Sequence, residues 1–533
     1  MPLIRTVAAA ALGLSLLGQI SFSATEITTQ ERVVLLAIDD VSLPLKENLC
    51  YYMTKPTVRK EPVLAPNRDD PNAPDHAAVN CYGTVILDGG RFRMWYYGKY
   101  FLESSDEPTQ DPLSQGPICY AESEDGIHWV RPNLGQVEIK GSRENNALKL
   151  PGTLTQAAMV IKEDRDSDPQ RRYKMVYNLT NSSGNWVFRT ATSPDGIRWT
   201  ASPDFATEKF LEISSFYRHQ GLYVVHGQGL TIGEGGFKEG RQGYARISTD
   251  FDHWFGEEVL AFALPEPVKG ADRGGTKIYD QVHLGVGGKS LGNVVIGLFG
   301  RWHNQPADEP ERDIPFAWFG YGKTSCDISL VVSNDGIHFR EPVKGHVFIS
   351  RFDSPTPPID GKSYPTALCQ SGNGILNVGD ETWIYHGRWR NGPYGSERWE
   401  EIALATLPRD RWGALGLFPS ENDGSVWSLP VTLPADGCEV VLNADGADGM
   451  RIEISDERFR PIPEFSGDQS GVALTADGLD VPLKWPKGNL HALGGRTVRF
   501  RIHFKKQGEV TPRLYAVYLR STATAVEPAR QAK

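Results

Sequence analysis

Residues 121–129 read Ala-Glu-Ser-Glu-Asp-Gly-Ile-His-Trp, and related versions of this pattern return along the chain. In most copies a β-prone run meets a turn of the Ser-x-Asp-Gly type and then continues to an aromatic side chain. Asp and Gly tolerate the positive φ that a tight hairpin turn requires. The pattern therefore predicts a repeated β-hairpin unit with an aromatic residue at a fixed place. The copies end at Trp129, Trp199, Trp254, Phe339 and Trp412.

The spacing between the copies is that of a whole supersecondary unit. Successive aromatic residues lie 70, 55, 85 and 73 positions apart. Further strand-like runs, such as 91–97 and 172–177, precede the copies and give each repeat about four strands, the content of one propeller blade. We expect an all-β fold with a five-bladed β-propeller. The alternative is a coincidence of Asp-Gly hairpins in a β-sandwich, and the recurring aromatic residue favours the propeller.

The repeat disappears after about residue 430. Alternating strands such as 450–454 and 497–502 continue there, and a stretch of this length suits one β-sandwich. We expect no catalytic residue in it, because its charged residues are scattered. The predicted division is a signal peptide at 1–24, a catalytic propeller at 25–430, a β-sandwich at 431–521 and a disordered tail at 522–533.

The N-terminus has the features of a signal peptide. Arg5 provides the positive charge, the run 7–17 is apolar, and the small residues at 21–24 offer a cleavage site. We therefore expect a secreted or periplasmic protein, with an uncleaved anchor as the alternative. No later stretch reaches 18 apolar residues, so no membrane span is expected.

Charge and cysteine spacing exclude several partners and cofactors. The net charge of −10, without a basic stripe, argues against nucleic acid. The six cysteines form no Cys-x-x-Cys pair, and no histidine pair has a diagnostic metal spacing. We expect no metal and no other cofactor. Export permits disulfides, and Cys50 with Cys81 is the first pair we would expect. The oligomeric state is left open.

Four stretches, 36–40, 120–129, 404–412 and 443–445, resemble the invertase type of glycoside hydrolase, family 32, its family 43 relatives, and a set of secreted bacterial proteins related to them. The resemblance implies a five-bladed propeller followed by a β-sandwich, a carbohydrate substrate, and an active site at the channel mouth. The chain departs from the invertase motifs. It has Asp70-Pro71-Asn72-Ala73 without a following Gly, Asp168-Pro169 without a preceding Arg, and no Glu-Cys. The catalytic residues are therefore not fixed by the resemblance.

Blade geometry supplies candidates for them. Channel-mouth residues lie where each innermost strand begins and where each second strand ends. Glycoside hydrolysis uses two carboxyl groups, one protonated as acid and one ionised as base or nucleophile. The candidates, in order, are Asp280, Glu212, Asp75 and Asp70. Each could instead be a solvated loop or turn residue.

Basic and aromatic side chains gather at the same predicted positions. Their number, against three or four carboxylates, predicts a substrate that carries a uronate or sulfate, because Arg pairs with planar anions. These groups could instead pair with the acids or with backbone carbonyls. The candidates for substrate binding are His76, Lys99, Gln156, His226, His283, Arg301, Trp302, His303, Gln370, His386 and Arg388.

The sequence thus predicts a secreted glycoside hydrolase that acts on a polysaccharide or oligosaccharide. A non-catalytic carbohydrate-binding propeller is the main alternative, because the invertase motifs are incomplete. A sialidase-like enzyme and a metal-dependent lyase or hydrolase rank lower. Two carboxyl groups facing the channel at about 5–10 Å would distinguish an enzyme from a binding module.

Overall fold

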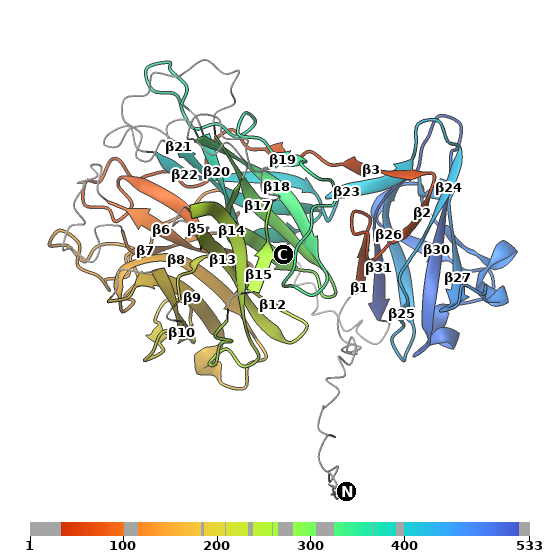
Figure 1. Cartoon of the computed structure of the whole chain (residues 1–533), viewed down its shortest axis with the longest axis horizontal. Coiled ribbons are helices and arrows are strands. Elements are labelled where there is room, and N and C mark those ends of the chain that lie inside the picture. The colour runs from red at the N-terminus through yellow and green to blue at the C-terminus, as the bar shows by residue number, and fades with distance from the viewer. Residues whose placement is uncertain are drawn as a thin grey trace, which may run out of the picture.

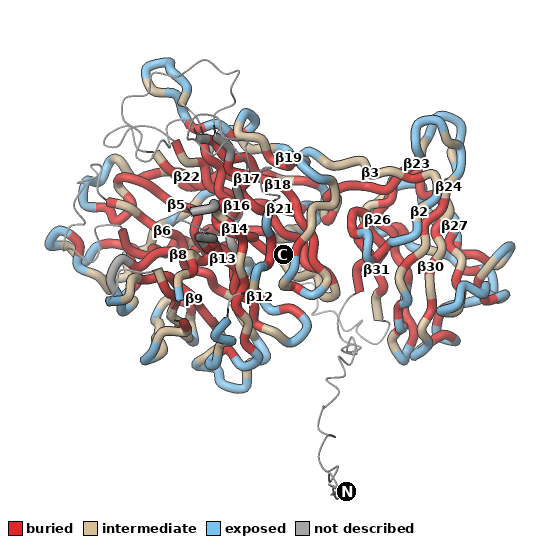
Figure 2. Tube along the Cα trace, in the orientation of Figure 1, coloured by how far each residue is buried: buried red, intermediate tan, exposed pale blue. Residues whose placement is uncertain are grey.

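The computed structural model describes residues 33–100, 116–182, 186–207, 209–232, 238–257, 259–264, 281–304, 324–364, 366–390 and 399–521. Strands dominate the described structure, with short 3-10 helices between them, which confirms the all-β class. Figure 1 shows a larger ring-like body and a smaller body that holds the C-terminal strands. Figure 2 shows buried residues along the strands and exposed residues at the loops. Among the described residues, no helix is long and apolar enough to cross a membrane.

The ring-like body consists of five antiparallel groups, and within each group neighbouring strands are hydrogen-bonded. The fifth group is completed by β4, which comes from the N-terminal side of the chain. The groups are β5 (Ala78–Asp88), β6 (Arg91–Lys99) and β7 (Ile118–Ser123); β8 (Thr153–Lys162), β9 (Tyr173–Thr180), β10 (Trp186–Ser193) and β11 (Thr200–Ala201); β12 (Glu212–His219), β13 (Leu222–Ile232), β14 (Lys238–Ser248) and β15 (Val259–Phe262); β16 (Gln281–Ser290), β17 (Val295–Asn304), β18 (Thr324–Ser333) and β19 (Val347–Ile349); β20 (Thr366–Val378), β21 (Glu381–Arg390), β22 (Glu400–Pro408) and β4 (Thr57–Val58).

The first strands of the groups, β5, β8, β12, β16 and β20, contact one another around the axis of the ring. Each of them breaks register with its partner part-way along its length. A bulge of this kind inserts residues and re-aims the side chains beyond it. The two ends of one strand can therefore present unrelated side chains to the axis. The shifts fall between Asn80 and Thr84, Gln156 and Ala158, Ile213 and Ser215, His283 and Val286, and Gln370 and Ile375.

Polar side chains at this level join neighbouring first strands, and we call them the girdle: Thr84, Ser215, Gln370 and Asn373. Thr84 bonds the backbone of β8 through Ala158 O and Val160 N. Ser215 Oγ donates to Val286 O at 2.7 Å, and Gln370 Nε2 donates to two carbonyls of β16. Asn373 bonds β8 and β12. The girdle satisfies backbone groups that the bulges leave unpaired.

The quoted turns share one hydrogen-bond pattern in the first four copies. In the first, Ser123 Oγ accepts the amides of Asp125 and Gly126, and Asp125 Oδ1 accepts those of Ile127 and His128. The aspartate thereby fixes the turn as an Asx-type motif. The copy at Asp410 differs, because its amide donates to Thr382 Oγ1 instead.

Each turn packs on the preceding group, and the first turn packs on the fifth. Tyr385 of β21 donates its hydroxyl to Gly126 O at 2.8 Å. Trp95 of β6 likewise donates to Gly196 O at 2.8 Å. The fifth aromatic residue, Trp412, lies 5.7 Å from the ring of Phe348 in the fourth group. These contacts close the ring.

The smaller body contains N-terminal strands as well as C-terminal ones. β1 (Val33–Leu36) pairs with β31 (Arg513–Ser521), β2 (Leu45–Glu47) with β24 (Asp423–Trp427), and β3 (Leu49–Met53) with β23 (Gly413–Leu417). Residues 33–53 and 413–427, which the sequence assigned to the propeller, therefore lie in the C-terminal sheet. The sequence pattern did not show this, because the paired strands lie hundreds of residues apart.

One buried apolar core holds this smaller body together, with Leu35, Leu415, Val426, Phe500 and Val517 among its members. Within the described part of the chain, the 3-10 helices are Pro169–Arg171, Ala447–Gly449, Pro463–Phe465, Gly467–Gln469 and Leu490–Leu493. The remaining strands are β25 (Val431–Thr432), β26 (Cys438–Asp445), β27 (Met450–Asp456), β28 (Gly471–Ala473), β29 (Gly478–Lys484) and β30 (Thr497–Lys505).

The expected disulfide between Cys50 and Cys81 is wrong. All six cysteines are free thiols. Cys50 lies on β3 in the C-terminal sheet, whereas Cys81 lies on β5 in the ring. The two residues are close in sequence but belong to different bodies, so they cannot approach each other.

Candidate functional site

The first strands begin at one end of the ring axis, which we call the glutamate end. Glu400, the first residue of β22, is buried there. Its Oε1 accepts Lys99 Nζ at 2.8 Å, and its Oε2 accepts Asn80 Nδ2 at 2.8 Å. Lys99 ends β6, so the ion pair joins the fifth group to the first. An ammonium group and an amide group therefore both donate to the Glu400 carboxylate.

Glu212 begins β12 at the same end of the axis. Its Oε2 accepts Gln228 Nε2 at 3.1 Å. Burial raises the pKa of the Glu212 carboxyl, while the positive charges of Arg241 and Lys99 oppose that shift. A raised pKa keeps a carboxyl protonated closer to neutral pH, which a proton donor requires.

The charges of both glutamates act on the buried phenol of Tyr82. Burial raises the pKa of this phenol well above its ordinary value, and the charges of Cys369, Glu212 and Glu400 raise it further. Both carboxylates therefore lie within electrostatic reach of one buried hydroxyl, so the glutamate end brings together two carboxyl groups in different environments.

An aromatic wall stands beside these acids. The ring of Trp302 lies 4.6 Å from that of His283 and 6.1 Å from that of Trp389. The Arg241 guanidinium lies 4.7 Å from the centre of the Trp302 ring. Burial, and then the Arg241 charge, lower the pKa of His283 well below its ordinary value. His283 is therefore neutral. Trp302 is buried and Trp389 is half-buried, so Trp389 is the more exposed of the two indole rings.

Gln370 and Gln156 are buried at the bulges of their strands. Gln370 uses its amide nitrogen in the girdle, where it donates to His283 O and Gly285 O at 2.9 Å. Gln156 lies opposite Asn178 in the β8–β9 ladder. Of the predicted residues, Lys99 acts electrostatically on the Glu212 carboxyl, and Gln370 contacts His283, whose ring packs on Trp302.

Asp75, Asp70 and His76 lie in the loop that precedes β5. Asp75 is fully buried, and its Oδ2 accepts Arg131 Nε at 2.6 Å and the Tyr96 hydroxyl at 2.7 Å. Asp70 is exposed and accepts the Asn72 amide at 2.9 Å. His76 Nδ1 lies 3.1 Å from Asn67 O. These contacts hold the loop, and the structure does not bring these side chains into contact with Glu212 or Glu400.

Two further candidate cations are paired within the ring. Arg388 Nη1 contacts Glu401 Oε1 at 3.2 Å, and both side chains are buried. Arg301 pairs with Glu341 and donates to Ser329 Oγ. With Lys99 on Glu400, each of the three predicted cations thus contacts a carboxylate.

Two more histidines are buried and neutral. Burial lowers the pKa of His226 to about 4 and that of His386 to about 3. His226 stacks on Tyr217, with ring centres 5.9 Å apart, and His386 Nε2 lies 2.8 Å from Ser354 Oγ. Neither histidine adds positive charge near neutral pH.

Asp280 lies outside the described residues, as does the side chain of His303. Asp280 directly precedes Gln281, the first residue of β16, and stays a prediction for the glutamate end. Among the described residues there is no group of three or more His, Cys, Asp or Glu side chains that could hold a metal ion.

Sequence reasoning missed Glu400 and Arg241. Both lie at or near the start of a third strand, β22 and β14, whereas the search considered only the starts of first strands and the ends of second strands. Asp327 lies near the start of the third strand β18 and is buried against Arg351. A search that included third-strand starts would have found Glu400 from the run Trp399-Glu400-Glu401.

Comparisons with known proteins give a broad likeness. No family model matches the chain. Two uncharacterized proteins, from two strains of Mycobacterium tuberculosis, are each 28% identical over 164 residues, which is 28% of this chain and 48% of each of those proteins. The chain thus spans about half the length of the curated relatives it matches.

Solved structures similar to this chain include glycoside hydrolases. A thermostable family-43 glycoside hydrolase is 13% identical, with a TM-score of 0.38, over 64% of this chain and 90% of that one. A family 43 arabinoxylan arabinofuranohydrolase from Bacillus subtilis is 10% identical, with a TM-score of 0.38, over 86% and 99%. A putative glycosidase from Bacteroides thetaiotaomicron is 12% identical, with a TM-score of 0.40, over 66% and 96%. Family 43 is the relationship that the sequence resemblance named.

Proposed function

We propose that this chain is a glycoside hydrolase whose site is the glutamate end of a five-bladed propeller, the five antiparallel groups being its blades. The observation that carries the proposal is a pair of glutamates, one half-buried and one buried, in unlike environments. Glycoside hydrolysis requires one carboxyl group that donates a proton and one that is ionised. We assign the first role to Glu212 and the second to Glu400.

Glu212 is the proposed proton donor. Burial raises its pKa, and Gln228 donates a hydrogen bond to it from a neutral amide. Glu400 is the proposed ionised partner, since Lys99 and Asn80 both donate to it. Asp280 remains a further candidate for the ionised role, because it directly precedes β16 at the same end of the axis.

Trp302 and Trp389 are the proposed platform for a sugar ring. The apolar face of a sugar stacks on an indole much as other apolar groups do, and the two rings lie 6.1 Å apart beside the acids. A polysaccharide or oligosaccharide would place one ring on this wall and its glycosidic oxygen near Glu212.

The alternative, a carbohydrate-binding propeller without catalysis, is favoured by one observation. Both oxygens of Glu400 already accept hydrogen bonds from protein groups. A carboxylate held in this way would have to exchange one of those bonds to reach a water or a sugar carbon. Hydrolysis tests with Glu400 variants separate the two functions.

An anionic substrate remains part of the proposal, and the Arg241 guanidinium lies over the Trp302 ring at the same end of the axis. Lys99, Arg301 and Arg388 each contact a carboxylate, so the excess of cations counted in the sequence is offset within the protein. The rates of hydrolysis of matched neutral and uronate-containing glycans, at low and high salt, test this point. Equal rates on both, without salt dependence, would remove the anionic class.

We propose that the strands from β23 onward form a β-sandwich together with β1, β2 and β3. We also propose export to the periplasm or the medium, because segment 1–24 has the features of a signal peptide. Amino-terminal sequencing of the protein recovered from its native compartment tests the cleavage. An intact Met1 there would contradict it.

The deciding experiment is a screen of the purified chain on plant and microbial polysaccharides, followed by Glu212→Gln on any substrate that is cut. We expect that variant to lose hydrolysis while it keeps binding the glycan. Asp70→Asn, in an exposed turn, is the matched control. Full activity in Glu212→Gln would exclude it as the acid, and glycan binding without hydrolysis by the unaltered chain would support the binding alternative.

A further inference from the structure

A cavity lies at the other end of the ring axis, where the first strands end. It has a volume of about 750 Å³ and is lined by the terminal parts of β5, β8, β12, β16 and β20. We call this the lysine end, after Lys289. Volumes of this size are typical of sites for small molecules. The girdle lies between this cavity and Glu212, because Asn373 lines the cavity and Gln370 precedes it on the same strand.

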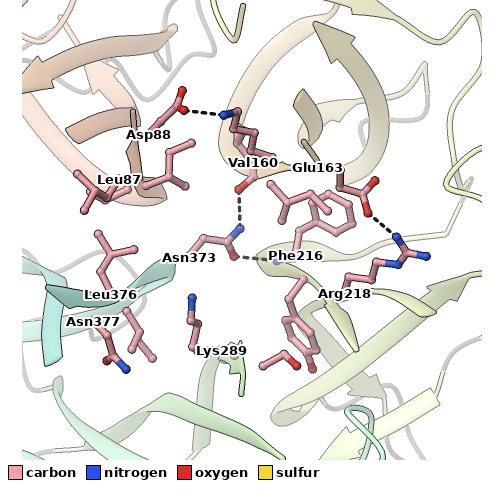
Figure 3. Close-up of a pocket in the computed structure, with 18 of the residues that line it drawn as sticks. Leu87, Asp88, Val160, Glu163, Phe216, Arg218, Lys289, Asn373, Leu376 and Asn377 are labelled. Atoms are coloured by element: carbon pink, nitrogen blue, oxygen red, sulfur yellow. Dashed lines mark hydrogen bonds and ion pairs between the residues drawn. The ribbon is translucent and has the colours of Figure 1, made fainter. Parts of the chain in front are cut away.

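Figure 3 shows how the cavity is built. Asn373 lies at its centre, where its amide donates to Val160 O at 2.9 Å and accepts the Phe216 amide at 3.1 Å. Both ends of the Asn373 side chain are therefore occupied by the protein. Apolar side chains make up much of the remaining lining, among them Val85, Phe216, Tyr217, Ile375 and Leu376.

Most charges around the cavity neutralise one another. Lys162 Nζ contacts Asp88 at 2.7 Å and Asp164 at 2.6 Å. Arg218 Nη1 contacts Glu163 at 2.7 Å. These pairs lie along the rim formed by the ends of β5, β8 and β12. With Arg93 on Asp88 and Lys174 on Glu163 and Asp166, four cations face four carboxylates on this side of the cavity.

Lys289 is outside that network. It projects from β16 into the cavity (Figure 3), and no described residue makes a hydrogen bond or ion pair with its ammonium group. The nearest acid acting on it is Asp410, which instead accepts bonds from Asn377 at 2.9 Å and from Tyr518 at 2.8 Å. Lys289 is half-buried in the cavity wall, and this burial lowers the pKa of its ammonium group. An anion bound in the cavity would supply the counter-charge that the described residues do not.

We propose that the lysine end is a second ligand site, which binds a small monocarboxylate with an apolar or ring-shaped body and uses Lys289 as its counter-ion. The single ammonium group of Lys289 would pair with one carboxylate. The apolar lining would contact the apolar or ring-shaped part of the ligand, which a bare inorganic ion lacks. Dianions such as phosphate would require a second free cation. The site is independent of the proposed hydrolysis, because the girdle separates it from Glu212.

Isothermal titration calorimetry of the full chain tests the site with four probes: benzoate, glucuronate, glucose and inorganic phosphate. We expect saturable binding of benzoate, glucuronate or both, and no binding of glucose. Benzoate alone indicates an apolar carboxylate as the ligand, whereas glucuronate indicates an acidic sugar. Binding of phosphate more tightly than of either carboxylate would overturn the monocarboxylate class.

Variants assign the binding to this cavity. Lys289→Met should weaken carboxylate binding by tenfold or more, which is the loss of about 1.4 kcal/mol from one charge-assisted contact. Lys289→Arg should retain most of the affinity, and Lys289→Gln serves if the methionine variant does not fold. Lys162→Met, which removes an already paired lysine from the same rim, is the matched control.

Glu212→Gln should bind the carboxylate as the unaltered chain does, so failure of the proposed hydrolysis leaves this test intact. Equal affinity in the unaltered chain and in Lys289→Met, or no binding of either carboxylate, would refute the site.

Discussion

The two ends of the ring axis are built by the same five strands and differ in their chemistry. At the glutamate end, Glu212 and Glu400 lie near Lys99 and Arg241 beside indole rings. At the lysine end, one ammonium lies in a cavity with otherwise paired charges. The bulges between the two ends re-aim the side chains, so the residues at one end place little constraint on those at the other. One ring can therefore carry two unrelated sites.

The largest expected effect is at the glutamate end. Glu212→Gln and Glu400→Gln should each lower kcat on a cleaved glycan by a factor on the order of 10²–10⁴, because general acid–base catalysis contributes that much. Steady-state kinetics check this, with Asp70→Asn as the control. If either variant keeps more than a third of the activity, its residue is not one of the two catalytic carboxyl groups. The glutamate end would then lack the pair of acids that distinguishes it from the lysine end.

Glu400 and Glu401 are adjacent on β22 but have different partners. Glu400 pairs with Lys99, whereas Glu401 pairs with Arg388. Glu401→Gln should lower the free energy of unfolding by about 3 kcal/mol, since it leaves a buried guanidinium without its counter-charge. Glu400→Gln should lose less, because the Lys99 side chain is 14% exposed whereas that of Arg388 is 2% exposed. Urea denaturation of both variants measures the difference, and equal losses would show that Glu400 is structural too.

The girdle can be broken at Asn373. Asn373→Ala removes two partly buried hydrogen bonds and leaves the Phe216 amide unpaired. We expect a loss of about 1–3 kcal/mol in the free energy of unfolding. Asn133→Ala, at an exposed turn, should stay within about 0.5 kcal/mol of the unaltered chain. If Asn373→Ala also lowers the free energy of unfolding by no more than about 0.5 kcal/mol, the Asn373 hydrogen bonds of the girdle do not stabilise the ring.

The smallest expected effect concerns the pKa of Glu212. Because its folded-state pKa is raised above the unfolded value, the native state retains a proton that the unfolded state releases. The free energy of unfolding should therefore fall as the pH rises from about 4.5 through the raised pKa, relative to Glu212→Gln. Urea denaturation at a series of pH values measures this. A difference between the two proteins that does not change with pH would contradict the raised pKa.

Much of the local structure was predictable. The Ser-Asp-Gly turns formed where the sequence placed them, because their hydrogen bonds involve residues within three positions of one another. Glu212 was identified because it begins a first strand. Glu400 was missed because it begins a third strand and not a first one. The sequence also did not show that Asp75 pairs with Arg131, because Arg131 lies 56 positions further along the chain.

By itself, the sequence determined the all-β class, the repeat and its turns, because these depend on short-range propensity and on hydrogen bonds between near neighbours. Only the tertiary structure decided which strands share a sheet, such as β1 with β31, and which charges neutralise one another, such as Arg388 with Glu401. It also decided that Lys289 projects into a cavity while Lys162 is paired. The physical reason is that pairing and burial depend on groups that only folding brings together, and side-chain pKa values follow from that placement.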